Sequence, residues 1–179
     1  MRTDERATDV ALRVGLEYER RLTEGTHYRA IRMPVRKRPD LAPQYVLVLF
    51  TTHREGAWHF ADALGKAGVE WEQAWFEEQV RRGDLVVPTL FGETPVFDAE
   101  AYRKQNGPRW TAIIEQNIHG LLEQHPRLTL AEVVPEVYGK TLGQAWIPHV
   151  RAAVKSLHAR GYIPRTGHGD FWKQVLYRS

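Results

Sequence analysis

The C-terminal third of the chain carries a succession of apolar patterns that few folds accommodate. Residues 108–124 begin with a proline and place isoleucine and leucine side chains on one face of a predicted helix. Residues 129–132 read Thr-Leu-Ala-Glu, the pattern of a capping box that opens a second helix, which Pro135 should shorten or kink. A third predicted helix repeats apolar residues at near-heptad spacing and stops at Gly161, a typical left-handed cap position. Its apolar face consists of Ile147, Val150, Val154 and Leu157.

Two short extended segments close the chain. Residues 162–165 and 171–177 flank a turn rich in glycine, which predicts a hairpin. The order of a helix, a short helix, a turn, a helix and a hairpin is that of a winged helix. We therefore predict a winged helix-turn-helix domain over residues 108–179.

Residues 1–107 predict a separate, small α/β domain. An amphipathic helix up to Gly25 precedes a strand over residues 27–35 and a basic, proline-marked loop. Residues 45–50, Tyr-Val-Leu-Val-Leu-Phe, have the uninterrupted apolar character of a strand buried on both faces. Two helical stretches follow and are expected to end at Gly68 and Gly83. The predicted fold class is α+β, with a helix and strands that form part of a Rossmann-like sheet edge, followed by the winged helix.

Composition and motif content argue against most enzyme classes. The chain has no cysteine, so disulfides, thiolate metal sites and cysteine nucleophiles are excluded. Its eight histidines lack the spacing that places two metal ligands on one helical face. No P-loop, Rossmann glycine motif or nucleophile elbow occurs. We expect no catalytic residue, no metal, no cofactor and no membrane span, and therefore a cytoplasmic protein.

The predicted third helix and hairpin supply a candidate nucleic-acid surface. In helix-turn-helix folds the second helix of the motif enters the major groove. Basic side chains that point away from the core would contact phosphates, while Ala152 and Ser156 at the centre of this face offer little for reading bases. The alternative is a protein-docking face, because the net charge is only +3 and small residues suit close packing on a partner. The candidate binding residues are His149, Arg151, Lys155, Arg160, Arg165, His168 and Lys173.

A polar corner follows the strand predicted over residues 45–50. Thr52 and His53 form a possible ligand site, because crevices at the carboxyl ends of strands commonly bind ligands. The structural alternative is that Thr52 caps the next helix and His53 bonds to nearby backbone.

The same corner carries a resemblance to a known family. Residues 45–56 read Tyr-Val-Leu-Val-Leu-Phe-Thr-Thr-His-Arg-Glu-Gly and precede a helix. Residues 88–91, Pro-Thr-Leu-Phe, residues 129–132 and the closing Gly-Tyr-Ile at 161–163 follow in order. In pattern and order, about residues 8–165 resemble the C-terminal part of three-Cys-motif partner proteins.

The resemblance implies a Rossmann-type methyltransferase domain with a winged-helix tail, encoded beside a radical-SAM-like protein with a three-cysteine motif. The early helix and strands would correspond to the last elements of the methyltransferase-like sheet. The preceding half is lacking, including the Asp-Leu-Phe-Ala-Gly-Pro-Gly-like loop that would hold a nucleoside cofactor. So small a sheet would leave an apolar face and an edge bare, so we expect a homodimer or a partner chain to cover it.

These observations predict a non-enzymatic accessory subunit that binds nucleic acid, most naturally duplex DNA, through phosphate-backbone contacts. Two alternatives remain open. One is a protein-interaction subunit that docks a partner such as the three-cysteine-motif protein. The other is the C-terminal part of a split methyltransferase-like enzyme.

Overall fold

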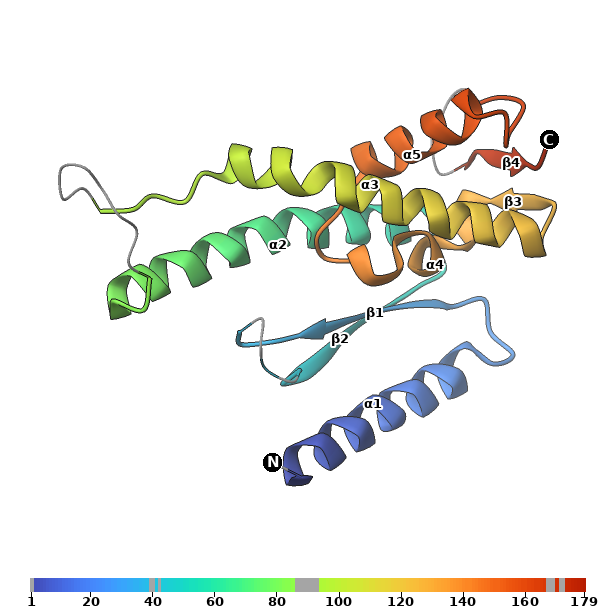
Figure 1. Cartoon of the computed structure of the whole chain (residues 1–179). Coiled ribbons are helices and arrows are strands. Elements are labelled where there is room, and N and C mark those ends of the chain that lie inside the picture. The colour runs from blue at the N-terminus through green and yellow to red at the C-terminus, as the bar shows by residue number, and fades with distance from the viewer. Residues whose placement is uncertain (1, 39–40, 42, 86–93, 167–169, 171–172) are drawn as a thin grey trace.

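A computed structural model describes the chain except for residues 1, 39–40, 42, 86–93, 167–169 and 171–172 (Figure 1). The described residues form an α+β fold with two small antiparallel sheets, β1–β2 and β3–β4, which confirms the predicted class. None of the helices in this part of the chain combines the length and apolar character needed to cross a membrane. The elements in chain order are α1 (Arg2–Thr23), β1 (Arg29–Val35), β2 (Tyr45–Thr51), α2 (Arg54–Arg82), α3 (Ala99–Gln124), β3 (Arg127–Thr129), the 3-10 turn η1 (Leu130–Glu132), α4 (Val134–Tyr138), the 3-10 turn η2 (Gly139–Thr141), α5 (Ile147–Ala159) and β4 (Val175–Tyr177).

The β1–β2 hairpin lies between α1 and a helical body formed by the later elements (Figure 1). On the α1 side, the ring of Tyr18 meets Phe50 edge-on at 6.0 Å and Glu19 pairs with Arg32 at 2.5 Å. On the other face, Ile31 is 1% exposed and belongs to the core of the helical body. The hairpin therefore joins α1 on one side and the core of the helical body on the other.

The strand predicted over residues 45–50 exists, but the expectation that both of its faces are buried is wrong. Tyr45 is 60% exposed and Leu47 is 43% exposed. In the described structure β2 pairs only with β1, and these two side chains stay exposed although Arg38, in the loop between the strands, lies over the Trp75 ring of α2 at 5.9 Å. The predicted bare apolar face is present in the isolated chain.

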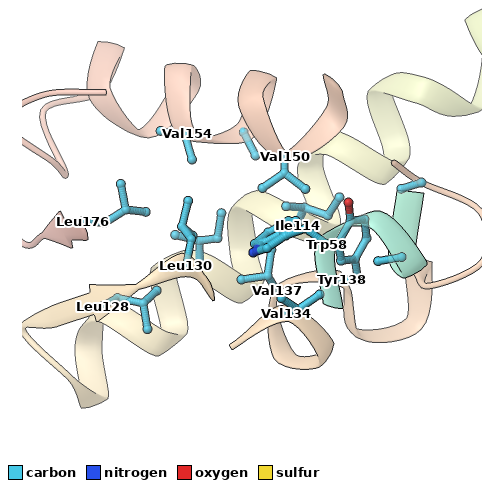
Figure 2. Packing of buried hydrophobic residues seen from close by; sticks show 14 of the residues in the cluster. Trp58, Ile114, Leu128, Leu130, Val134, Val137, Tyr138, Val150, Val154 and Leu176 are labelled. Carbon is cyan, nitrogen blue, oxygen red and sulfur yellow. The ribbon is translucent and has the colours of Figure 1, made fainter. Parts of the chain in front are cut away.

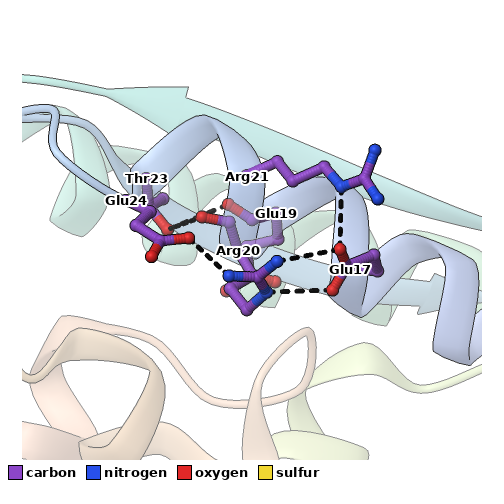
Figure 3. A network of polar contacts seen from close by, with 6 residues as sticks. All are labelled: Glu17, Glu19, Arg20, Arg21, Thr23 and Glu24. Atoms are coloured by element: carbon purple, nitrogen blue, oxygen red, sulfur yellow. Dashed lines mark hydrogen bonds and ion pairs between the residues drawn. The ribbon is translucent and has the colours of Figure 1, made fainter.

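Helix α1 is held together by charged side chains on its own surface (Figure 3). Glu17 accepts hydrogen bonds from Arg20 at 2.9 Å and from Arg21 at 2.7 Å, and Arg20 also pairs with Glu24. These bonds lower the pKa of Glu17 to about 2. All four side chains are solvent-exposed, so the network supports the helix locally and does not bury it against the body.

Helix α2 is a single helix of 29 residues, so the predicted end at Gly68 is wrong. A Cβ atom on Gly65 would lie 2.2 Å from the carbonyl oxygen of Ala145, and one on Gly68 would lie 1.8 Å from that of Gly143. The two glycines therefore allow the loop before α5 to touch the backbone of α2. The helix instead ends at Gly83, as predicted, with a left-handed φ of 74°.

Helix α3 begins nine residues before the predicted start at Pro108, which lies inside it. The Asp98 carboxylate caps its first turn by accepting hydrogen bonds from the backbone N–H groups of Glu100 at 3.0 Å and Ala101 at 2.9 Å. The expected end at His125 is confirmed.

The capping box predicted at residues 129–132 does not form. The Thr129 side chain makes no cap hydrogen bond, and a 3-10 turn precedes α4, with Pro135 in the first turn of that helix. The Glu132 carboxylate lies 3.3 Å from the guanidinium of Arg54 and 3.7 Å from that of Arg29. Two charged partners outcompete a single backbone N–H, and they tie the hairpin and α2 to the C-terminal elements.

The predicted terminal hairpin is also corrected. Strand β4 pairs with β3, with Leu176 opposite Leu128, and residues 162–165 form no strand in the described structure. Gly161 has a φ of 78° and the Tyr162 N–H donates to the carbonyl of Leu157 at 3.0 Å, which confirms the predicted helix cap. The start of this segment therefore ends α5 instead of beginning a strand.

One apolar cluster joins the hairpin, α2 and the C-terminal elements (Figure 2). Trp58 of α2 is fully buried, and its ring lies 5.7 Å from that of Tyr138 in α4. The cluster draws members from both sides of the predicted domain division between residues 107 and 108, and that division remains a prediction. The predicted apolar faces of α3 and α5 are confirmed by the burial of Ile114, Ile118, Leu122, Val150, Val154 and Leu157.

Candidate nucleic-acid interface

The outward face of α5 carries exposed basic side chains. Val150, Val154 and Leu157 anchor the helix in the core. Arg151 and Lys155 are exposed and four residues apart, which places them on the same side of the helix. This part of the predicted surface is a short basic row with alanines beside it.

His149 does not lie on that face as expected. Its ring stands edge-on to Trp146 at 4.5 Å and to Trp110 at 5.2 Å. Its Nδ1 accepts a hydrogen bond from the backbone N–H of Trp146 at 3.2 Å, and burial lowers the pKa of the ring. A neutral imidazole in this place fixes the start of α5.

The remaining predicted contacts are partly engaged within the chain. Arg160 pairs with Glu115 at 2.9 Å, and Lys173 pairs with Asp170 at 2.6 Å. Arg165 is exposed, and His168 lies outside the described residues. A phosphate would have to compete with a carboxylate at Arg160 and Lys173, but not at Lys155.

The polar corner after β2 does not have the predicted alternative arrangement, in which Thr52 caps the next helix. The Thr51 hydroxyl, not that of Thr52, accepts a hydrogen bond from the His53 N–H at 3.0 Å. His53 is the N-cap residue of α2 without a side-chain cap bond. Both Thr52 and His53 are exposed at the end of the strand, and the capping role expected for Thr52 is wrong.

A first hollow, of about 320 Å³, lies between α3 and the end of α5. In its lining, Glu115 pairs with Arg160 at 2.9 Å, and the Nδ1 of His119 lies 3.8 Å from Glu123. The ring of Tyr162 packs edge-on against His119 at 4.6 Å. No group of three potential metal ligands is found in the part of the chain that the structure describes.

A second hollow, of about 290 Å³, lies between α3 and the turn that precedes α5, and we call it the basic hollow. The described residues that line it include no acidic side chain and two cations, Arg109 of α3 and Lys140 of η2. Sequence analysis missed it because these residues lie in different predicted elements. Its lining residues are Tyr102, Asn106, Arg109, Trp110, Ile113, Lys140, Thr141 and Gln144.

No protein-family model matches the chain, and neither a curated protein nor a solved structure matches it. Functional inference therefore depends on the geometry and chemistry of these surfaces.

Proposed function

We propose that residues 108–179 form a winged helix, with its first helix extended to the start of α3, and that the chain is a non-enzymatic accessory subunit that binds the backbone of duplex DNA. The order α3, β3, α4, α5, β4, with β4 antiparallel to β3, supports this proposal. In such a module α4 and α5 are the helix-turn-helix pair, and α5 is the helix presented to the groove.

The observation that carries the proposal is the exposed row of Arg151 and Lys155 on α5. Ala152 and Ala159 are exposed beside this row and cannot bond to bases, and the Nδ1 of the nearby His158 lies 3.1 Å from the carbonyl oxygen of Ile163. The interface would therefore hold phosphates and show little sequence preference.

Salt-dependent binding to duplex DNA tests this function. If several phosphates are neutralised, the slope of log affinity against log salt is about −3 or steeper. Charge reversal by Lys155→Glu with Arg165→Glu should weaken binding, whereas Arg13→Glu on the distant α1 should change it little. Absence of measurable binding at low salt would contradict the proposal.

A second candidate function is a protein-interaction subunit, and the N-terminal elements favour it. Apolar side chains of α1 and the hairpin remain exposed, and both outer edges of the β1–β2 sheet lack a partner strand among the described residues. The covering chain would be a second copy, a three-Cys-motif protein, or the cofactor half of a split methyltransferase-like enzyme. The exposed side chains are Val10, Val14, Leu16, Tyr18, Leu22, Tyr45 and Leu47.

Light scattering tests the self-association form of this candidate. A dimer at micromolar concentration would support it, because pairing two copies removes the exposed apolar side chains from water. A monomer in the absence of other proteins would contradict it. A neighbouring reading frame with a glycine-rich cofactor loop would favour the split-enzyme form.

A further inference from the structure

The basic hollow differs from the first hollow in that its cations are not held by carboxylates of the described residues. Among the described residues, Arg109 and Lys140 pair with no carboxylate. Arg160 and Lys173 each hold one. Two cations that line one cavity favour an anion in it by Coulomb attraction.

The floor and walls of the hollow are fixed by the core. Trp110 is 3% exposed and packs against Trp146 at 6.0 Å, so the α3 wall is rigid. Thr141 is buried, and its hydroxyl donates to the carbonyl of Tyr138 at 2.6 Å, which fixes the turn that carries Lys140. The two cations therefore project from anchored segments and not from a loose loop.

Hydrogen-bond donors complete the lining. Asn106 donates to the carbonyl of Tyr102 at 2.9 Å, which holds its amide at the wall, and the exposed Gln144 offers a further amide. Burial and Glu72 on α2 raise the pKa of Tyr102 to about 12, so its hydroxyl remains protonated at neutral pH. Glu72 is bound to Tyr102 and is not itself in the lining, whose guanidinium, ammonium and neutral amides are groups that proteins use to hold phosphate.

We propose that the basic hollow is a phosphate-binding site, with Arg109 and Lys140 as its two charged ligands. The phosphate group belongs either to a free nucleotide or to a nucleic-acid strand. This site does not line the outward face of α5 and does not depend on the proposed contacts of Arg151 and Lys155.

The test is titration of the full chain with inorganic phosphate at constant ionic strength, followed by amide NMR shifts of residues 140–144. Millimolar phosphate should shift these amides. Arg109→Gln with Lys140→Gln should weaken binding at least about tenfold, because two charge-assisted contacts are lost. The matched control Arg13→Gln with Arg178→Gln removes the same charge from exposed positions outside the hollow and should leave phosphate binding unchanged.

Both substitutions in the hollow variant replace exposed side chains, and an unchanged Tm shows that the fold of this variant is intact. Absence of a phosphate-dependent shift, or equal affinity in the double hollow variant and the wild type, would overturn the proposal.

Two further titrations identify the source of the phosphate. If the hollow variant has weaker binding of adenosine monophosphate but unchanged binding of duplex DNA, the ligand is a free nucleotide. If it lowers the salt slope of duplex binding by about two, the site holds a strand. If only the variant Lys155→Gln with Arg151→Gln loses duplex binding, the proposed function is supported. If the hollow variant also binds phosphate, adenosine monophosphate and duplex DNA as the wild type does, the phosphate site is refuted.

Discussion

The helical body and the α1–hairpin unit are stabilised in different ways. In the body, fully buried side chains such as Trp58, Ile114 and Val150 form one cluster that draws on elements far apart in the sequence. In α1, Val14 and Tyr18 are 61% and 58% exposed, and the helix surface is held by local ion pairs. The buried core of this chain is therefore centred on α2 and the C-terminal elements, and the apolar surface of α1 remains available to another molecule.

Removal of Trp58 should have the largest effect on the body. The side chain is fully buried and in contact with Tyr138, so Trp58→Ala should lower the free energy of unfolding by about 3–5 kcal/mol. Urea denaturation measures the change. A loss below about 1 kcal/mol would show that the cluster is less closely packed than the burial indicates.

The next largest effect is expected from substitution at the contact between α2 and the loop before α5. Gly68→Ala places a Cβ against the Gly143 carbonyl and should cost about 1–3 kcal/mol by overpacking. The matched control Gly120→Ala, in α3, meets no atom within 4 Å and should stabilise by about 0.5–1 kcal/mol. Equal effects of the two changes in thermal denaturation would contradict the close approach.

Truncation of an apolar side chain on α1 should have little effect on the free energy of unfolding. Val14→Ala should alter the free energy of unfolding by about 0.5 kcal/mol or less, because the side chain is already in contact with water. A loss above about 2 kcal/mol that grows with protein concentration would show that another copy of the chain covers α1 in solution.

The smallest effect concerns the pH dependence of α1. The pKa of Glu17 lies at about 2 in the folded chain, below its ordinary value of 4.5. The contribution of this carboxylate is therefore present above pH 4.5 and is lost as pH falls toward 2. Amide exchange in α1 should accelerate over this window, and Glu17→Gln should remove that part of the pH dependence. An acceleration that persists unchanged in the variant would assign it to other groups.

Much of the C-terminal fold could be predicted from local pattern. The apolar spacing of α3 and α5, the end at His125 and the left-handed cap at Gly161 all depend on residues within a few positions of each other. The predictions at Pro108 and Gly68 failed for the same kind of reason. Proline and glycine are permitted at several positions, and sequence alone did not show that Asp98 supplies an earlier cap or that Gly68 faces a backbone carbonyl.

The candidate site was predicted only in part. An exposed Lys155 on α5 follows from the helical period, since its apolar neighbours must face the core. The placement of His149 between two tryptophans and the ion pair of Arg160 with Glu115 involve side chains from α3, whose distance from α5 no local pattern gives.

The sequence by itself determined most of the helices, the β1 and β2 strands and the apolar faces of α3 and α5, because these follow from short-range geometry. The tertiary structure decided where those faces meet. It brought Glu132 to Arg54 and Arg29, placed Lys140 and Arg109 in the lining of one hollow, and left the first residues of β2 exposed. These contacts depend on close packing and charge pairing between segments that are far apart in the sequence. The packing and ion-pair energies arise only when those segments are in contact.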